Sequence, residues 1–176
     1  MQLVQPWPEG YTINARSPYG PRRLFGNVRF HHGVDVAMPV GTPLTAPADG
    51  TVVHKGSGAS GGFVLILRHE GNWHTVYYHL QKPSHRNLHE QVRLGDLIAY
   101  SGNTGRSTGP HLHFELRRSR KWGDTVDPVP YLTRAQTRSQ PRTRPSRVGR
   151  VSPGLESLSR SWMARGAHFL RGGFGR

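Results

Sequence analysis

Cysteine is absent from the 176 residues of this sequence. Disulfides, thiol nucleophiles and thiolate metal sites are therefore excluded, and a bound metal ion would need imidazole and carboxylate ligands. Long apolar runs are absent as well: no stretch approaches the roughly 20 apolar residues of a membrane-spanning helix. The opening residues, MQLVQPWPEGYTIN, also lack the basic start and apolar run of a signal peptide.

Acidic residues are scarce, and the resulting positive charge is uneven along the chain. Residues 1–132 contain 14 Lys and Arg against nine Asp and Glu, whereas residues 133–176 contain ten Arg against Glu156 alone. Residues 133–153 are rich in Arg, Pro, Ser and Thr and have too few apolar side chains to offset their ordering entropy, which predicts a flexible linker. In residues 154–176 apolar side chains recur at helical spacing, which predicts a basic amphipathic helix at the end of the tail.

Helical periodicity is missing from residues 1–132, which instead have the pattern of a β protein. Short apolar and β-branched runs alternate with turns rich in Gly, Pro and Asn. These runs are GTVVHKG, GGFVLILRHE, WHTVYYHL, LGDLIAYSG and PHLHFELRR. The pattern predicts a mainly β domain built from antiparallel sheet.

The first candidate site motif is HHGVD, in which His31 and Asp35 lie four residues apart. In an extended strand this spacing separates two residues by about 13 Å, so both side chains could reach one metal ion only if the chain bends. Gly33 makes such a bend inexpensive. From the residues alone, a metal-binding pair and a polar turn both remain open, and the turn is the commoner origin of such a pair.

The second motif is HLHFEL, where alternation places His111, His113 and Glu115 on one face of a strand. The apolar residues between them would face the core. Two imidazoles about 7 Å apart on one face can serve one site, one as a metal ligand and one beside it; a pair of exposed structural histidines is the alternative. A third histidine, His79, shares strand parity with Tyr77, and a lone strand histidine is more often a surface or hydrogen-bonded residue.

Together and in this order, these motifs resemble the lysostaphin-type zinc metallopeptidases, the LytM-like peptidoglycan endopeptidases. The resemblance runs from about Tyr11 to Asp127. It is carried by SPYGPR, RFHHGVDVAMPVGTPLTAPADGTVV, VYYHL and GNTGRSTGPHLHFEL. It implies a compact antiparallel β domain of the duplicated hybrid-motif type over residues 1–132, with the site in a groove between sheets.

The resemblance also implies roles for five residues. His31, Asp35 and His113 would bind one zinc ion with a position left for water, and His79 and His111 would be catalytic histidines beside it. Glu115 could hydrogen-bond to a ligand, although a surface position is the more frequent alternative. The histidines that match no role are expected at the surface. These are His32, His54, His69, His74, His85, His89 and His168.

The function implied is a monomeric zinc-dependent endopeptidase that cleaves stem peptides or crossbridges of bacterial peptidoglycan, in the periplasm or outside the cell. Because no signal peptide is visible, we expect a phage lysin or virion-associated wall hydrolase. We expect residues 133–176 to bind an anionic envelope surface (lipopolysaccharide, teichoic acid or phospholipid) or else to pack on the domain. The alternatives are a non-catalytic LytM-like regulator and a nucleic-acid-binding protein. Basic charge alone binds any polyanion, so the second of these is disfavoured.

Overall fold

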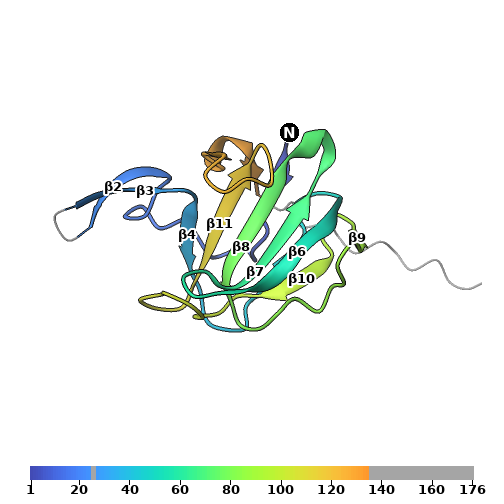
Figure 1. The fold of residues 1–176 in the computed structure, drawn as a ribbon, viewed down its shortest axis with the longest axis horizontal. Coiled ribbons are helices and arrows are strands. Elements are labelled where there is room, and N and C mark those ends of the chain that lie inside the picture. Colours follow the sequence, from blue (N-terminus) through green and yellow to red (C-terminus); the bar gives the residue numbers. More distant parts are fainter. Residues whose placement is uncertain (25–26, 135–176) are drawn as a thin grey trace, which may run out of the picture. The chain divides into compact units, whose positions relative to one another are not determined.

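The computed structural model describes residues 1–24 and 27–134, and strands account for most of their regular structure (Figure 1). Seven strands form one antiparallel sheet in the order β12–β11–β8–β7–β6–β9, and β4 joins the edge of β11 that β12 also occupies. Their bounds are β4 Val34–Ala37, β6 Gly50–Gly58, β7 Gly62–Arg68, β8 His74–Leu80, β9 Gln91–Val92, β11 His111–Arg117 and β12 Thr125–Val126. The predicted mainly β, antiparallel fold is confirmed.

Three smaller strand pairs and two short 3-10 helices complete the described part of the chain. Strands β2 and β3 form an antiparallel hairpin, β5 pairs with β10 antiparallel, and β1 pairs with β13 in parallel. Their bounds are β1 Leu3–Val4, β2 Gly20–Leu24, β3 Asn27–His31, β5 Pro43–Thr45, β10 Leu97–Tyr100, β13 Leu132–Thr133, η1 Glu70–Asn72 and η2 Val129–Tyr131. Strand β13 thus includes Thr133, the first residue of the predicted linker.

Most of the predicted linker and the whole amphipathic segment lie outside the described residues. Within the described part of the chain, no helix has the length and apolar character needed to cross a membrane.

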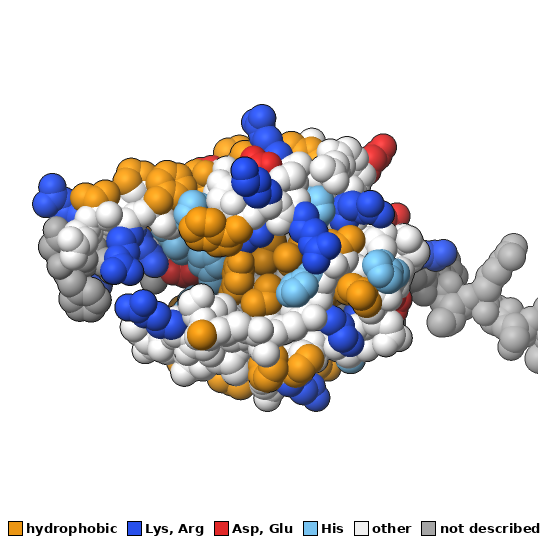
Figure 2. All heavy atoms as spheres, in the orientation of Figure 1, with side chains coloured by type: hydrophobic (Ala, Val, Ile, Leu, Met, Phe, Trp, Pro, Cys, Tyr) orange, Lys and Arg blue, Asp and Glu red, His pale blue; other side chains and the backbone are white. Residues whose placement is uncertain are grey.

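The two faces of the main sheet are buried to different degrees. On one face, Leu112, Phe114 and Leu116 of β11 are fully buried in the principal core, as the alternation in HLHFEL predicts. Burying each such side chain contributes roughly 1.5–3 kcal/mol, so this face fixes the orientation of the strand. The opposite face has a smaller apolar cluster that includes Val76 of β8. His113 of β11 lies on this second face. Figure 2 shows a hollow with hydrophobic side chains in its floor, Lys and Arg around its rim, and histidine and acidic side chains together at one end.

Candidate functional site

The three predicted metal ligands converge on one point although they come from three strands. His31 ends β3, Asp35 lies in β4 and His113 lies in β11. His31 Nε2 is 3.2 Å from Asp35 Oδ1 and 3.0 Å from His113 Nδ1, and His113 Nδ1 is 2.8 Å from Asp35 Oδ1. Among the described residues, this is the one group of His, Asp or Glu side chains that converges closely enough to hold a metal ion.

Strand pairing and one glycine bring these side chains together. In the β4–β11 pair, Asp35 lies directly opposite His113. The turn between β3 and β4 then brings His31 back onto the same site. Gly33 in this turn lies against β11 so closely that a Cβ atom there would overlap the carbonyl oxygen of Phe114. The glycine is thus needed for close approach to the sheet, whereas its φ lies outside the left-handed region, so the bend itself does not demand a glycine.

The outer nitrogen of each ligand imidazole is hydrogen-bonded to an acceptor. His31 Nδ1 donates to the carbonyl oxygen of Pro18 at 2.8 Å, and His113 Nε2 donates to Glu115 Oε1 at 3.1 Å. Such partners fix the tautomer, so that the lone pairs of His31 Nε2 and His113 Nδ1 face each other and Asp35. Three acceptor atoms this close repel one another unless they share a cation. A bound cation, or a proton on one imidazole that donates to Asp35, relieves this repulsion.

The pKa shifts of the site groups correspond to the second case, in which an imidazole donates to Asp35. Burial raises the pKa of the Asp35 carboxyl, but hydrogen bonds to His113, His31 and Ser17 outweigh burial and hold that pKa well below its usual range. Burial lowers the pKa of His113, whereas hydrogen bonds to Asp35 and Glu115 outweigh burial and raise it. The other Asp35 oxygen, Oδ2, accepts hydrogen bonds from Ser17 and, at 3.4 Å, from Arg22. Asp35 is therefore ionised at neutral pH and held with Oδ1 toward the site.

The donor set of two imidazoles and one carboxylate fits zinc. A catalytic zinc ion typically has three protein ligands and one open position, whereas a structural zinc ion has four protein ligands. The described residues supply three donors at this point, so the site matches the catalytic type.

Glu115 is buried, and the expectation that it lies at the surface is wrong. Its side chain is 3% exposed, and its second oxygen, Oε2, accepts a hydrogen bond from Arg117 Nε at 2.7 Å. Arg117 is also 3% exposed, and its Nη2 donates to the hydroxyl of Tyr78 at 2.8 Å. A buried ion pair thus holds the carboxylate that orients His113.

The two predicted catalytic histidines lie beside the ligands. The ring centroids of His79 and His111 are 4.6 Å apart, and His111 Nε2 is 3.8 Å from Asp35 Oδ1. Each Nδ1 donates to a backbone carbonyl at 2.8 Å, that of Thr104 for His79 and that of Gly109 for His111. Each ring therefore keeps Nε2 as its free basic nitrogen.

His79 reaches the site because β8 is irregular there. Tyr77 pairs with Leu65 and Leu80 pairs with Phe63, so Tyr78 and His79 together oppose one residue of β7. This is a β-bulge, which redirects the bulged side chain. His79 has φ 58°, in the left-handed region that few non-glycine residues adopt. Strict alternation would place His79 on the core face with Tyr77.

The environment of His79 suits a proton acceptor. Burial lowers its pKa, the hydrogen bond to Thr104 partly offsets this effect, and the neighbouring His111 and His113 lower the pKa further. The imidazole is therefore neutral at neutral pH.

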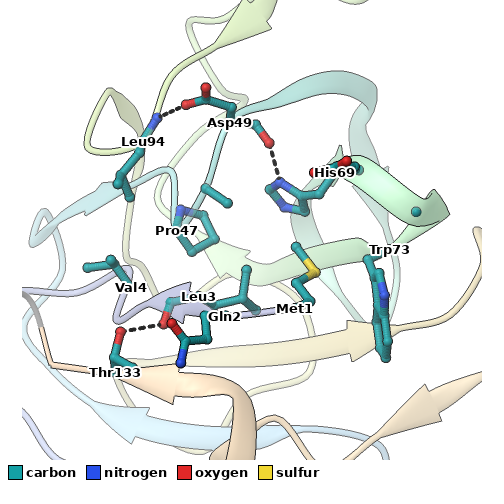
Figure 3. A pocket seen from close by; sticks show the side chains of 13 residues that line it. Met1, Gln2, Leu3, Val4, Pro47, Asp49, His69, Trp73, Leu94 and Thr133 are labelled. Atoms are coloured by element: carbon teal, nitrogen blue, oxygen red, sulfur yellow. Dashed lines mark hydrogen bonds between the residues drawn. The ribbon is translucent and has the colours of Figure 1, made fainter.

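Two other histidines are also buried, contrary to the surface positions expected of them. His69 and His74 are 5% and 3% exposed. His69 Nδ1 donates to the carbonyl oxygen of Asp49, and His69 Nε2 is hydrogen-bonded to Thr75 Oγ1, each at 2.8 Å. His69 also lines a cavity of about 750 Å³ beside β1 and η1, shown in Figure 3. None of the five predicted site residues lines this cavity, so it is separate from the candidate metal centre.

Comparison with known proteins gives consistent matches. Peptidoglycan DD-endopeptidase ShyA of Vibrio cholerae is 39% identical over 118 residues, which are 65% of this chain and 27% of that protein. A zinc-containing peptidase from Vibrio cholerae has a similar structure, with a TM-score of 0.62, 32% identity, and coverage of 72% of this chain and 39% of the other. The catalytic domain of the antimicrobial peptidase lysostaphin from Staphylococcus simulans gives a TM-score of 0.60 and 33% identity over 69% of this chain and 91% of that domain.

The chain spans about a quarter to a third of the length of the curated relatives it matches. The model of "Peptidase family M23" matches residues 29–128, more than half of the chain and the segment that contains all five predicted site residues. The resemblance to lysostaphin-type metallopeptidases is confirmed, and this chain belongs to peptidase family M23.

Proposed function

We propose that this protein is a zinc-dependent endopeptidase that hydrolyses peptide bonds in the stem peptides or crossbridges of bacterial peptidoglycan. The observation that carries the proposal is the convergence of His31 Nε2, Asp35 Oδ1 and His113 Nδ1 next to two imidazoles with free basic nitrogens. The family and the named activities of its relatives support the substrate class. All three donors come from one chain, so the site needs no partner subunit, and we propose one zinc ion per monomer.

The chemistry divides between the metal ligands and the histidines beside them. A zinc ion held by the three donors would lower the pKa of a bound water to about 7 and polarise the scissile carbonyl. His79 and His111, each protonated at Nδ1, can accept a proton at Nε2 and return it to the leaving amine. Glu115 cannot serve as the base, because His113 and Arg117 already occupy both of its oxygens.

The charge around the site complements this substrate. Arg29 shares a face of β3 with His31, is exposed, and has no carboxylate partner among the described residues. Lys and Arg side chains also rim the hollow in Figure 2. Peptidoglycan stem peptides carry carboxylates, which these cations can attract. The complete set of donors argues against the non-catalytic regulator.

Metal removal provides the direct test of this function. Treatment with a strong chelator is expected to abolish release of peptides from purified peptidoglycan, and added zinc is expected to restore it. Mass spectrometry of the fragments would identify the new termini and hence the bond cut, and elemental analysis should give one zinc per chain. Full digestion by metal-free, folded protein would refute the proposal.

We further propose that the basic tail concentrates the enzyme on an anionic envelope surface. A chain ending at Arg134 keeps β13 paired with β1 and removes most of the excess positive charge. This truncation is expected to leave cleavage of soluble wall peptides unchanged and to weaken binding to whole cells or anionic vesicles, most clearly at low salt. Cell binding equal to that of the full chain would contradict the targeting role.

A further inference from the structure

Four rings form a continuous row on the hairpin and the loop beside the candidate metal centre. Tyr19 meets Phe30 with ring centroids 5.2 Å apart, Phe30 meets His32 at 5.1 Å, and His32 meets Trp122 at 4.9 Å. Phe30 is 50% exposed and Trp122 is 69% exposed, and the nearby Val28 is 64% exposed. Contiguous exposed apolar surface of this kind marks an interaction site. We call Tyr19, Phe30, His32 and Trp122 the aromatic row.

Two members of the aromatic row are held in place by hydrogen bonds to a single strand. The hydroxyl of Tyr19 donates to the carbonyl oxygen of Thr125 at 2.9 Å, and His32 Nδ1 is hydrogen-bonded to Thr125 Oγ1 at 3.1 Å. Thr125 belongs to β12, which pairs with β11 of the main sheet. Tyr19 and His32 are therefore preordered, and Phe30 and Trp122 pack against them through ring contacts, which reduces the entropy cost of binding a ligand.

The position of the aromatic row relates it to the metal centre. Phe30 and His32 are the chain neighbours of the ligand His31. Because side chains alternate along β3, Phe30 lies on the face of the strand opposite His31. A ligand on the row would thus lie on the far side of the β2–β3 hairpin from the metal ligands.

We propose that the aromatic row binds the glycan strand to which the substrate peptide is attached. The apolar faces of pyranose rings stack on exposed aromatic side chains, while the imidazole of His32 and the indole N–H of Trp122 offer polar contacts to sugar hydroxyl and acetamido groups. A stem peptide of about four residues spans roughly 13 Å when extended. That length exceeds the roughly 10 Å between the mid-planes of packed sheets, so a stem peptide attached to a sugar on the row can pass around the hairpin to the metal centre. This inference rests on the proposed function.

The charges near the aromatic row favour this occupant. Arg23 on the hairpin and Arg120 and Lys121 in the loop that carries Trp122 are exposed. A glycan with carboxylate-bearing peptides is a polyanion and complements them. An anionic lipid surface has the same charge, but the row is joined to the metal centre through His31, and a glycan bearing stem peptides is the ligand that the metal centre itself requires nearby.

Binding of peptide-free glycan strands, prepared by removing the stem peptides from peptidoglycan with an amidase, tests the inference. Isothermal titration of the full zinc-loaded chain is expected to detect binding, and Trp122→Ala is expected to weaken it by about tenfold or more. Trp122→Tyr, which keeps a ring, should restore most of the affinity. Leu88→Ala is the matched control, because Leu88 is as exposed as Phe30 but lies between β8 and β9. Circular dichroism and zinc content should be equal in all variants.

Cleavage provides the second measurement. The ratio of kcat/KM on intact peptidoglycan to kcat/KM on a sugar-free crosslinked peptide should fall by about tenfold in Trp122→Ala, through KM. No glycan binding by the unaltered protein, equal binding by Trp122→Ala, or vesicle binding in place of glycan binding would each overturn the inference. If the protein binds glycan but cleaves neither substrate, glycan binding by the aromatic row is supported and only the proposed endopeptidase function is contradicted.

Discussion

Replacing His113 by Ala is expected to remove both zinc and peptidoglycan cleavage. The variant loses one of three protein donors, and two donors are too few for the catalytic type of zinc site. His31→Ala and Asp35→Ala should behave in the same way, since the three donor atoms lie at 2.8–3.2 Å from one another and act as one site. Elemental analysis of the purified variants and a peptide-release assay measure the two losses.

The opposite pattern is expected for His111→Ala, which should keep near-stoichiometric zinc and lose rate. His111 Nε2 is 3.8 Å from the ligand atom Asp35 Oδ1, and its Nδ1 is bound to Gly109, so its position suits proton transfer beside the metal centre. Loss of an acid–base group lowers the rate by about 10²–10⁴-fold. The His111 and His113 variants should therefore both be slow but differ in metal content.

His79 calls for a different substitution because its backbone has φ 58°. Alanine is disfavoured in this region, whereas asparagine is enriched there. The amide of His79→Asn can also donate to the carbonyl oxygen of Thr104 in place of Nδ1. This variant should match His111→Ala, with zinc retained and rate lost.

An exposed histidine supplies the control for these variants. His85→Ala should keep both zinc and activity, since His85 is exposed and lies between β8 and β9, away from the ligands. Circular dichroism should show the same fold for every variant. If His111→Ala loses zinc while His113→Ala retains it, the two roles are reversed. If both variants remain active, neither histidine belongs to the site.

Strand alternation was sufficient to predict the faces of β11 but not the position of His79. In HLHFEL every second residue is a large apolar side chain that is buried, and burial of that face fixes the direction of His111 and His113. The bulge at His79 depends on pairing with β7 and on a hydrogen bond from its backbone N–H to the carbonyl oxygen of Gly61. Both contacts join β8 to residues outside that strand, so the periodicity of the β8 sequence cannot predict them.

The convergence of His31 and Asp35 was likewise only partly visible in the sequence. Gly33 indicated a bend, but the meeting of the two side chains depends on β4 pairing with β11. For Glu115 a signal did exist, because Arg117 lies two residues further along and alternation puts both on the same face of β11. The sequence alone did not show that Glu115 and Arg117 would be buried together as an ion pair. His69 and His74 are buried by similar non-local packing.

Glu115 should determine how tightly zinc is held, although it is not one of the three donors. Its carboxylate accepts the hydrogen bond from His113 Nε2 and so keeps the lone pair of Nδ1 directed at the site. Partners of this kind typically change metal affinity by about 10–100-fold. Glu115→Gln removes the negative charge, and the glutamine amide can turn so that its N–H₂ donates to His113 Nε2. The ring proton of His113 would then have to move to Nδ1, the nitrogen proposed to bind the metal. We therefore expect a loss of affinity of that size, measured by competition with a chromophoric chelator.

A second substitution separates this role from simple support of the fold. Glu115→Gln alone leaves the buried Arg117 without its counter-charge, which costs about 3–5 kcal/mol of stability in comparable buried pairs. Adding Arg117→Met removes that charge, so the double variant should regain much of the lost melting temperature. Its zinc affinity should stay low, because the methionine side chain gives His113 no new hydrogen-bond acceptor. If stability and zinc affinity recover together, Glu115 only supports the fold and the positioning role is wrong.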